Sequence, residues 1–576
     1  MKHDKRKTHG IHYTPPELAA FLARVTAKHI CRDGGIVEIL DPACGGGSLL
    51  QAMVGAMPSA VHSRLCLFGF ETDREAIQQA ESALSHCRVR SIQLQELDFL
   101  SLEGTSSVFR NSRQRGLFDG EESDYLVRFD AVVANPPYVR TQVLGSHRSR
   151  QLARQFDLTG RVDLYHAFVK AMAATLKPGG VLGLLTSNRF LTVKSGAALR
   201  RLFRTEFELE EVYDMGDTKL FDAAVLPVVV VCRRKCPSAT SRCTFVRVYE
   251  YRNDQTSPLA DHSCRSALDA LLDRRVKGIV RTPKGTYTVE RGTLLAGGPE
   301  DVWSLTTPES REWLRVVEAN RACSFGDLSF VRVGIKTTAD KVFLRDDWSS
   351  LPVEQQPEDP LLRPLITHSI AGRWRPDRPP GAARVLYPHV VKDGRRVPIA
   401  LDDYPRASSY LTAHRQRLQR RKYVMDAGRQ WYEIWVPHNP DEWQRPKIVF
   451  PDIAEVPRCF LDRSGAVVNG DCYWITLKNG IEEGWLLMML AVANSSFIAK
   501  YYDVLFHNKL YAGRRRFMTQ YVKEFPLPTM ESRVGRQIVA LASRLVDGSP
   551  EGNDESALDA LVWQAFGLRE EIRRQV

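Results

Sequence analysis

The chain has 576 residues, more than one ordinary hydrophobic core accommodates, and we therefore expect two or three domains. Its 43% hydrophobic and 26% charged residues are typical of a folded soluble protein and exclude a largely disordered chain. The net charge of +12 favours a polyanionic partner. Because the sequence has no long apolar stretch, we expect no membrane span and no secretory signal.

The eleven cysteines are scattered without a regular framework, which is typical of a protein of the reducing cytoplasm. Cys232, Cys236 and Cys243 form the one cluster, but they lack the paired CxxC spacing of a zinc site. We expect ordinary thiols near the end of a strand, and no bound metal is predicted.

Short apolar runs alternate with helical stretches between residues 36 and 234. Buried strands are predicted at residues 36–40, 65–70, 129–134, 181–186 and 225–232. Helices are predicted at residues 74–86 and 165–176, and residues 177–180, Lys-Pro-Gly-Gly, are expected to end the second helix and turn into the next strand. This alternation predicts an α/β fold with a parallel sheet and helices on both faces.

A glycine-rich turn, Asp41-Pro42-Ala43-Cys44-Gly45-Gly46-Gly47-Ser48, directly follows the first predicted strand. Its glycines let the backbone approach a ligand closely, and the helix that starts there can hold a nucleotide-like group at its N-terminus. The carboxylate of Asp41 suits a cationic ligand, such as a sulfonium with an α-amino group. The glycine spacing is not the dinucleotide-binding fingerprint, and an ordinary strand–helix turn is the alternative.

Carboxylates also follow the predicted strand at residues 65–70 and the segment at residues 92–97. Glu71 can accept hydrogen bonds from both ribose hydroxyls. Asp98 can accept one from an adenine amino group while the neighbouring ring of Phe99 covers the base. A solvated strand end is the alternative for each residue alone, but the ordered set indicates a nucleoside-binding site.

The most informative motif is Asn135-Pro136-Pro137-Tyr138, which follows the strand at residues 129–134. Two prolines predict a rigid loop at the edge where open α/β sheets hold their ligands. The Asn135 side-chain oxygen and the Pro136 carbonyl can both accept hydrogen bonds from a planar amino group and stabilise the charge that develops when it attacks a methyl group. Tyr138 can stack on a base that has been flipped out of a duplex. A plain rigid turn is the alternative.

The second half of the chain has a different composition. Residues 251–263 are polar and predict a linker, and beyond about residue 300 the chain is rich in Arg, Trp, Tyr and Pro, with one candidate turn at Ser464-Gly465. Arginine-rich segments at residues 140–161, 414–421 and 513–517 are candidates for contacts with phosphate groups. A solvated charged face is the alternative for each segment.

With these motifs in this order, the sequence resembles the gamma-class, TaqI-type N6-adenine DNA methyltransferases of restriction–modification and phage-defence systems. The resemblance implies a Rossmann-like class I methyltransferase domain over residues 1–245, a connecting region over 246–309 and a mixed α+β target-recognition domain over 310–576. It implies an enzyme that flips adenine out of double-stranded DNA and methylates its N6 amino group, with S-adenosylmethionine as cofactor.

The resemblance also implies roles for individual residues. Thr14, in Thr14-Pro15-Pro16-Glu17, would contact the methionine end of the cofactor, and it also has the features of a helix cap with Glu17 closing a capping box. The residues that would bind the cofactor are Asp41, Ala43, Gly45, Glu71, Asp98 and Phe99. Asn135 and Pro136 would bind the target amino group. Tyr138 and Phe221 would stack on the flipped base, although Phe221 could instead be a core residue. Weaker landmarks of the specificity domain are residues 334–338 with Phe343, residues 447–452 and residues 493–495.

Several alternatives remain open from the sequence. Methylation of cytosine N4, of an RNA amino group or of a protein glutamine uses similar chemistry, and a non-catalytic DNA-specificity subunit is a further alternative. Cytosine C5 methylation is disfavoured because no Pro-Cys dipeptide occurs. Only about a dozen residues precede Thr14, so no nuclease domain is expected ahead of it, and any cleavage would belong to a separate endonuclease.

Overall fold

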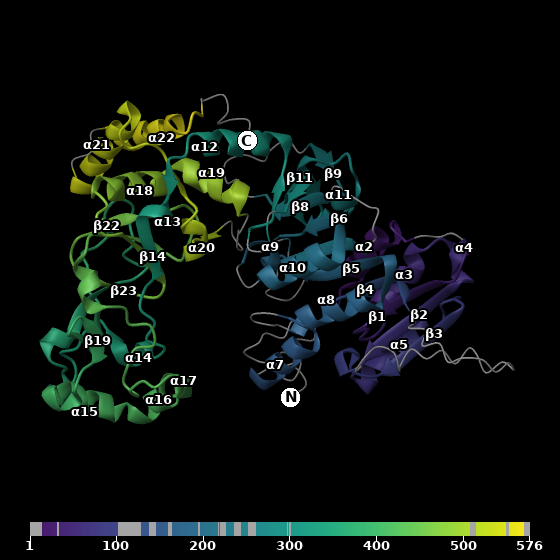
Figure 1. The fold of residues 1–576 in the computed structure, drawn as a ribbon, viewed down its shortest axis with the longest axis horizontal. Coiled ribbons are helices and arrows are strands. Elements are labelled where there is room, and N and C mark those ends of the chain that lie inside the picture. The colour runs from purple at the N-terminus through teal and green to yellow at the C-terminus, as the bar shows by residue number, and fades with distance from the viewer. Residues whose placement is uncertain are drawn as a thin grey trace. The chain divides into compact units, whose positions relative to one another are not determined.

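The computed structural model describes residues 14–30, 34–101, 128–137, 146–158, 164–193, 196–216, 218, 226–235, 243–251, 261–296, 298, 301–506, 514–548 and 552–568. The chain divides into two compact units, Met1–Pro308 and Glu309–Val576 (Figure 1). Among the helices that the structure describes, none combines the length and the apolar character needed to cross a membrane.

The first unit is built on one large sheet. Its strands are β1 (Val37–Asp41), β2 (Leu65–Glu71), β3 (Ser91–Glu96), β4 (Phe129–Ala134), β5 (Leu176–Ser187), β6 (Phe207–Asp214), β7 (Pro227–Arg234), β8 (Thr244–Glu250), β9 (His262–Ser263), β10 (Gly278–Thr282), β11 (Gly285–Leu295) and β12 (Ser304–Thr306). The spatial order is β3-β2-β1-β4-β5-β7-β6-β8-β11-β10-β9, with β12 paired to β11. β1 to β5 are mutually parallel, whereas β7 runs antiparallel to both of its neighbours.

Helices cover this sheet on both faces, as the alternating sequence pattern predicts. They are α2 (Pro16–Ala27), α3 (Ser48–Ala56), α4 (Ser59–His62), α5 (Arg74–Leu84), α7 (Ser146–Gln155), α8 (Leu164–Thr175), α9 (Arg189–Thr192), α10 (Ala197–Glu206) and α11 (Ala267–Leu272). Ile39 faces a core with residues of α2 and α3, and its neighbour Leu40 faces a second core with residues of α8 and α10. The parallel strands are therefore buried on both faces, which is why they are continuous apolar runs in the sequence.

The predicted elements of this unit match the observed ones to within a few residues, with one informative difference. The Lys-Pro-Gly-Gly sequence lies inside β5, because Phe129 pairs with Leu176 and Ala131 with Val181. The four residues between Leu176 and Val181 therefore bulge out of the ladder. Gly179 has a φ of +76°, a conformation that favours glycine.

The region 246–309 differs from the expected connecting segment. Most of β8 and all of β9 to β12 lie in it, and they extend the same sheet from β6 outward. Buried side chains such as Val248, Val280 and Val289 join the core that α2 covers. The polar stretch at residues 251–263 predicts a linker, and the strands on either side of it are not among the predicted elements.

The second unit is a mixed α+β structure, as predicted. Its helices are α12 (Pro308–Ala319), α13 (Phe325–Leu328), α14 (Asp340–Phe343), α15 (Pro405–Ala413), α16 (Arg415–Gln419), α17 (Lys422–Asp426), α18 (Gly484–Asn494), α19 (Ser496–Leu505), α20 (Thr519–Val522), α21 (Arg533–Asp547) and α22 (Asp554–Ala565). Its strands are β13 (Cys323–Ser324), β14 (Ser329–Val333), β15 (Leu344–Arg345), β16 (Leu362–Ile366), β17 (Arg384–Leu386), β18 (His389–Lys392), β19 (Arg395–Pro398), β20 (Lys447–Pro451), β21 (Ile453–Ala454), β22 (Phe460–Asp462), β23 (Val467–Val468), β24 (Cys472–Leu477), β25 (Arg515–Arg516) and β26 (Pro526–Leu527).

Two four-stranded sheets, β14-β24-β20-β22 and β15-β17-β16-β23, form the centre of the second unit. The predicted turn at Ser464-Gly465 is present, with a φ of +78° at Gly465. It joins strands of different sheets, since β22 pairs with β20 and β23 pairs with β16. The turn therefore connects two sheets and does not close a hairpin.

Candidate functional site

Four of the sequence-predicted site residues lie at one edge of the first sheet. The parallel strands β1 to β4 end there in register, with the pairs Asp41–Gly69, Glu71–Glu96 and Leu40–Val132. The chain order reverses between β1 and β4, and such a switch point is where open α/β sheets form a ligand crevice. The strand ends therefore bring Asp41, Glu71, Asp98 and Asn135 to this switch point.

Asp41 is a buried carboxylate at the start of the glycine-rich turn, with 1% of its surface exposed. Its Oδ1 accepts a hydrogen bond from the Ala43 N–H at 3.1 Å, whereas its buried Oδ2 has no partner among the described residues. Burial raises the pKa of Asp41 to about 7, and the nearby negative charge of Glu71 adds to this shift. An isolated buried carboxylate of this kind is suited to a cationic ligand.

The turn itself is held in a conformation that favours glycine. Gly45 and Gly47 have φ angles of +50° and +82°. A Cβ at Gly47 would lie 3.1 Å from Ala80 of α5, so a larger residue would push the turn away from that helix. The Gly45 N–H donates to Glu71 Oε2 at 3.1 Å, which links the turn to the end of β2.

The carboxylate of Glu71 accepts hydrogen bonds from several backbone N–H groups. Its Oε1 accepts from the backbone N–H groups of Thr72 and Asp73 at 2.7 and 3.0 Å. The carboxylate is thus fixed at the end of β2, between the glycine-rich turn and α5. A ribose would have to share Glu71 with these backbone donors.

Asp98 and Phe99 are placed differently from each other. Asp98 Oδ1 accepts from the Leu100 N–H at 2.9 Å, and its Oδ2 lies 3.5 Å from a guanidinium nitrogen of Arg148 on α7. Phe99 is 4% exposed and stacks on Phe168, with 5.9 Å between ring centroids. Contrary to the expectation that its ring covers a base, most of the Phe99 ring packs in the core.

Asn135 and Thr14 are joined by a hydrogen bond across 121 residues of sequence. The Asn135 side-chain amide donates to Thr14 Oγ1 at 3.0 Å, and Pro136 next to it is buried. The expected helix cap at Thr14 is wrong, because α2 begins at Pro16 and Pro15 takes the cap position without a side-chain hydrogen bond. Thr14 instead orients the amide, so that its carbonyl oxygen is the acceptor group on the other side.

A buried polar network beside this site has no counterpart in the sequence prediction. Asp214, at the end of β6, accepts from the Asn188 side chain at 3.0 Å, from the Gly216 N–H at 3.1 Å and from the Tyr249 hydroxyl at 2.8 Å. Burial raises the pKa of Asp214 despite these donors. Neither Asn188 nor Tyr249 belongs to a recognisable motif, which explains why sequence reasoning missed the network.

Some expectations fall outside the described residues, namely those on Tyr138, Arg140, Phe221 and Cys236. Of the cysteine cluster, Cys232 is buried in β7, where burial raises the pKa of its thiol, and Cys243 directly precedes β8.

The arginine-rich segments of the second unit separate into two kinds. Arg515 and Arg516 are paired with Asp503 and Asp452 at 2.7 and 3.0 Å, so the expected phosphate contacts are not supported for these two. Arg421 is buried and donates to backbone carbonyls, so it too is not a surface phosphate ligand. Arg415, Arg417 and Arg420 are exposed.

Comparison with known proteins adds an independent line of evidence. The family described as Eco57I restriction-modification methylase matches residues 65–221, and the TaqI-like C-terminal specificity domain matches residues 398–527. The type II methyltransferase M.BanIII of Aneurinibacillus aneurinilyticus is 37% identical over 581 residues, covering 98% of each chain. The type II methyltransferase M.BstVI of Geobacillus stearothermophilus is 24% identical, covering 98% of this chain and 96% of its own.

A solved structure shares the fold of most of the chain. The type IIL restriction-modification enzyme MmeI, in complex with DNA, superposes with a TM-score of 0.57 at 11% identity, covering 96% of this chain and 72% of that one. The two regions matched by families lie in different units, residues 65–221 in the first and 398–527 in the second.

Proposed function

This chain belongs to the type II DNA methyltransferases of restriction–modification systems, and we propose that it transfers a methyl group from S-adenosylmethionine to the N6 amino group of adenine in double-stranded DNA. The observation that carries the proposal is the oriented amide of Asn135 at the carboxyl end of β4. It stands beside a buried Pro136 and across the sheet edge from an isolated buried carboxylate at Asp41.

The target amine determines what Asn135 has to do. The N6 lone pair of adenine is delocalised into the ring, so the amine is a poor nucleophile. The Asn135 oxygen and the Pro136 carbonyl accept hydrogen bonds from this amino group and stabilise the positive charge that develops on it. The hydrogen bond to Thr14 holds the amide in the orientation that this requires.

The residues around the glycine-rich turn fit S-adenosylmethionine. Asp41 Oδ2, which has no partner among the described residues, would accept a hydrogen bond from the cationic amino group at the methionine end of the cofactor. The backbone at Ala43 and Gly45 would pack against the same end of the cofactor. Glu71 and Asp98 would hold its nucleoside. When bound, the cofactor supplies an electrophilic methyl group. The protein's part is to align that group with an adenine that has left the duplex stack.

The two units have different roles in this proposal. We assign methyl transfer to the first unit, including the strands of region 246–309, and DNA target recognition to the second unit over residues 310–576. A separate endonuclease would carry out any cleavage.

The proposal is tested by incubating duplex DNA with the purified protein and S-adenosylmethionine labelled in its methyl group, followed by digestion to nucleosides. Label in N6-methyladenine supports the proposal. Label in N4-methylcytosine, label in protein or RNA alone, or no transfer would overturn it. Asn135→Ala provides the matched control, because it should bind the cofactor like the unaltered protein and transfer no label.

A further inference from the structure

Exposed basic side chains without acidic partners gather on one end of the second unit. Helices α15, α16 and α17 follow one another along this end (Figure 1). Arg415, Arg417, Arg420 and Lys422 are all exposed there, and among the described residues no carboxylate lies within ion-pairing distance of any of them. The one exposed carboxylate of this stretch is Asp426. Burial and the charges of Arg417 and Arg345 lower the pKa of His414, consistent with a positive field.

Several other arginines of the unit are, by contrast, paired with carboxylates. They include the exposed Arg315 with Glu312, the exposed Arg463 with Glu483 and the half-buried Arg384 with Asp359, at 2.7 to 2.8 Å. The second arginine-rich segment is neutralised in the same way. Arg415, Arg417, Arg420 and Lys422 have no such carboxylate within the part of the chain that the structure describes.

Aromatic rings border the basic residues. The Arg415 guanidinium lies 5.3 Å from the centre of the Trp431 ring, and that of Arg429 lies 5.0 Å from the Trp435 ring. Tyr423, which is 44% exposed, packs edge-on against Trp435 with 5.0 Å between centroids. Stacking on Trp431 fixes the Arg415 guanidinium in advance, which lowers the entropy lost when it binds an anion.

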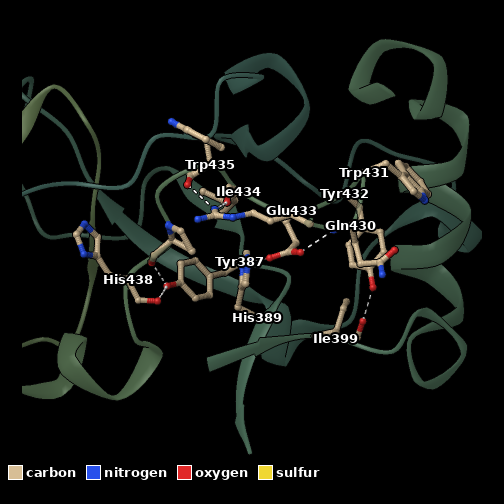
Figure 2. Close-up of polar contacts among 12 residues, drawn as sticks. Tyr387, His389, Ile399, Gln430, Trp431, Tyr432, Glu433, Ile434, Trp435 and His438 are labelled. Atoms are coloured by element: carbon tan, nitrogen blue, oxygen red, sulfur yellow. Dashed lines mark hydrogen bonds and ion pairs between the residues drawn. The ribbon is translucent and has the colours of Figure 1, made fainter. Parts of the chain in front are cut away.

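The segment at residues 430–438 that carries these rings is itself rigidly held. Figure 2 shows the Glu433 side chain accepting from the Gln430 N–H at 2.7 Å and the Tyr432 hydroxyl bonded to the Ile399 carbonyl at 2.7 Å. At the other end the Tyr387 hydroxyl is hydrogen-bonded to the backbone of Pro437 and His438. Trp431 and Trp435 thus project from a backbone that is tied at both ends.

Arg421 joins this segment to the rest of the surface. It donates to the carbonyls of Thr337, Glu433 and Trp431 at 2.7 to 3.0 Å and lies over the Phe343 ring. It therefore ties the segment 334–338 and the segment 430–438 to the end of α16. Arg421 therefore holds in place the backbone that carries the exposed residues Arg420 and Lys422.

We infer that the surface formed by Arg415, Arg417, Arg420, Lys422, Tyr423, Trp431 and Trp435 is a contact of the second unit with double-stranded DNA. Three exposed guanidinium groups, one of which is stacked on Trp431, match the phosphate backbone, which presents closely spaced negative charges. The buried Arg421 is the positioning residue of this surface. The inference rests on the proposed function, because it takes duplex DNA as the partner.

The salt dependence of DNA affinity tests the inference in the full-length protein. Each phosphate contact contributes about 0.9 to the slope of log affinity against log salt. The triple variant Arg415→Gln, Arg417→Gln, Arg420→Gln should have a slope shallower by about 2 to 3 when duplex binding is followed by fluorescence anisotropy between about 50 and 200 mM salt. The matched control is Arg315→Gln, Arg384→Gln, Arg463→Gln, which removes the same charge from paired arginines and should keep the original slope.

The outcomes separate this inference from the proposed function. If the unaltered protein does not bind duplex DNA, the proposed function itself fails. If it binds DNA and the first triple variant keeps the original slope, the surface assignment alone is wrong. Equal losses in both triple variants would show that net charge, and not this surface, sets the affinity, and would also overturn the assignment.

Discussion

At the scale of single residues, the hydrogen bond between Asn135 and Thr14 ties the N-terminal segment to the loop after β4. Thr14 is buried, with 8% of its surface exposed, and Asn135 is half-buried. The sequence resemblance assigns Thr14 to the cofactor, and the structure assigns its hydroxyl to the orientation of Asn135. These two roles predict different kinetic effects.

Thr14→Val should lower the single-turnover rate of methyl transfer by about 3- to 10-fold, because one hydrogen bond is worth roughly 0.5–1.5 kcal/mol. The dissociation constant of the cofactor should change little. Thr14→Ser keeps the hydroxyl and should restore the rate. A variant that loses cofactor affinity but transfers at the normal rate would favour the role in cofactor binding instead.

The buried carboxylate of Asp41 makes stability and cofactor binding depend on pH in opposite ways. Its folded-state pKa of about 7 lies above the ordinary value of 3.8, so the folded protein binds more protons than the unfolded chain between these values. Without cofactor, this contribution to the free energy of unfolding is fully present below about pH 4 and is lost as the pH rises through 7. A cationic ligand needs the ionised form, so its affinity should rise with pH up to about 7.

Asp41→Asn should accordingly raise the melting temperature of the cofactor-free protein at pH 8 and leave it nearly unchanged at pH 4. The same variant should bind S-adenosylmethionine at least about tenfold more weakly at pH 8, as expected when a charged hydrogen bond of 1.5–3 kcal/mol is lost. Differential scanning fluorimetry and titration calorimetry measure the two effects. A variant that is destabilised at pH 8 would contradict the isolated-carboxylate account.

At the scale of elements, the sheet continues beyond the strands that carry the site. β8 pairs with β6 in parallel, and its Tyr249 donates to Asp214 at the end of β6. Val246 and Val248 of β8 are almost fully buried. The region between residues 246 and 309 therefore supports the methyltransferase sheet.

Two fragments of the first unit test this dependence. A fragment of residues 1–308 should fold and bind S-adenosylmethionine with an affinity close to that of the full chain. A fragment of residues 1–243 should melt at a lower temperature, because β6 loses its pairing with β8, Asp214 loses the Tyr249 hydroxyl, and buried valines are removed. Circular dichroism melting and calorimetry measure both properties. Equal stability of the two fragments would show that β8 to β12 are dispensable.

The sequence predicts the elements that are buried on both faces and fails where the pattern is mixed. The apolar runs of β1, β2, β4 and β5 and the carboxylates that follow the strands are evident in the sequence. β6 is missed because its sequence, Phe-Glu-Leu-Glu-Glu-Val-Tyr-Asp, contains three glutamates. One of them, Glu211, is buried in β6 and accepts from the Tyr213 hydroxyl at 2.7 Å, a compensation that only the folded structure reveals.

At the scale of the whole molecule, the order of motifs along the chain predicts a methyltransferase part followed by a specificity part, and the family matches agree with that order. Side-chain roles are harder to predict than the order of parts. Arg420 and Arg421 are neighbours in sequence, yet one is exposed and the other is buried against carbonyls. Phe99 packs in the core although its motif favours a ligand contact. Such differences depend on long-range packing, which local patterns do not encode.

The most direct test of the account is single-molecule sequencing of DNA from cells that lack other methyltransferases and express this protein or its Asn135→Ala variant. The account predicts N6-methyladenine at nearly every copy of one short sequence with the unaltered protein and none with the variant, while both proteins accumulate equally. Methylated cytosine, adenine methylation without a defined sequence, or unchanged methylation by Asn135→Ala would contradict it.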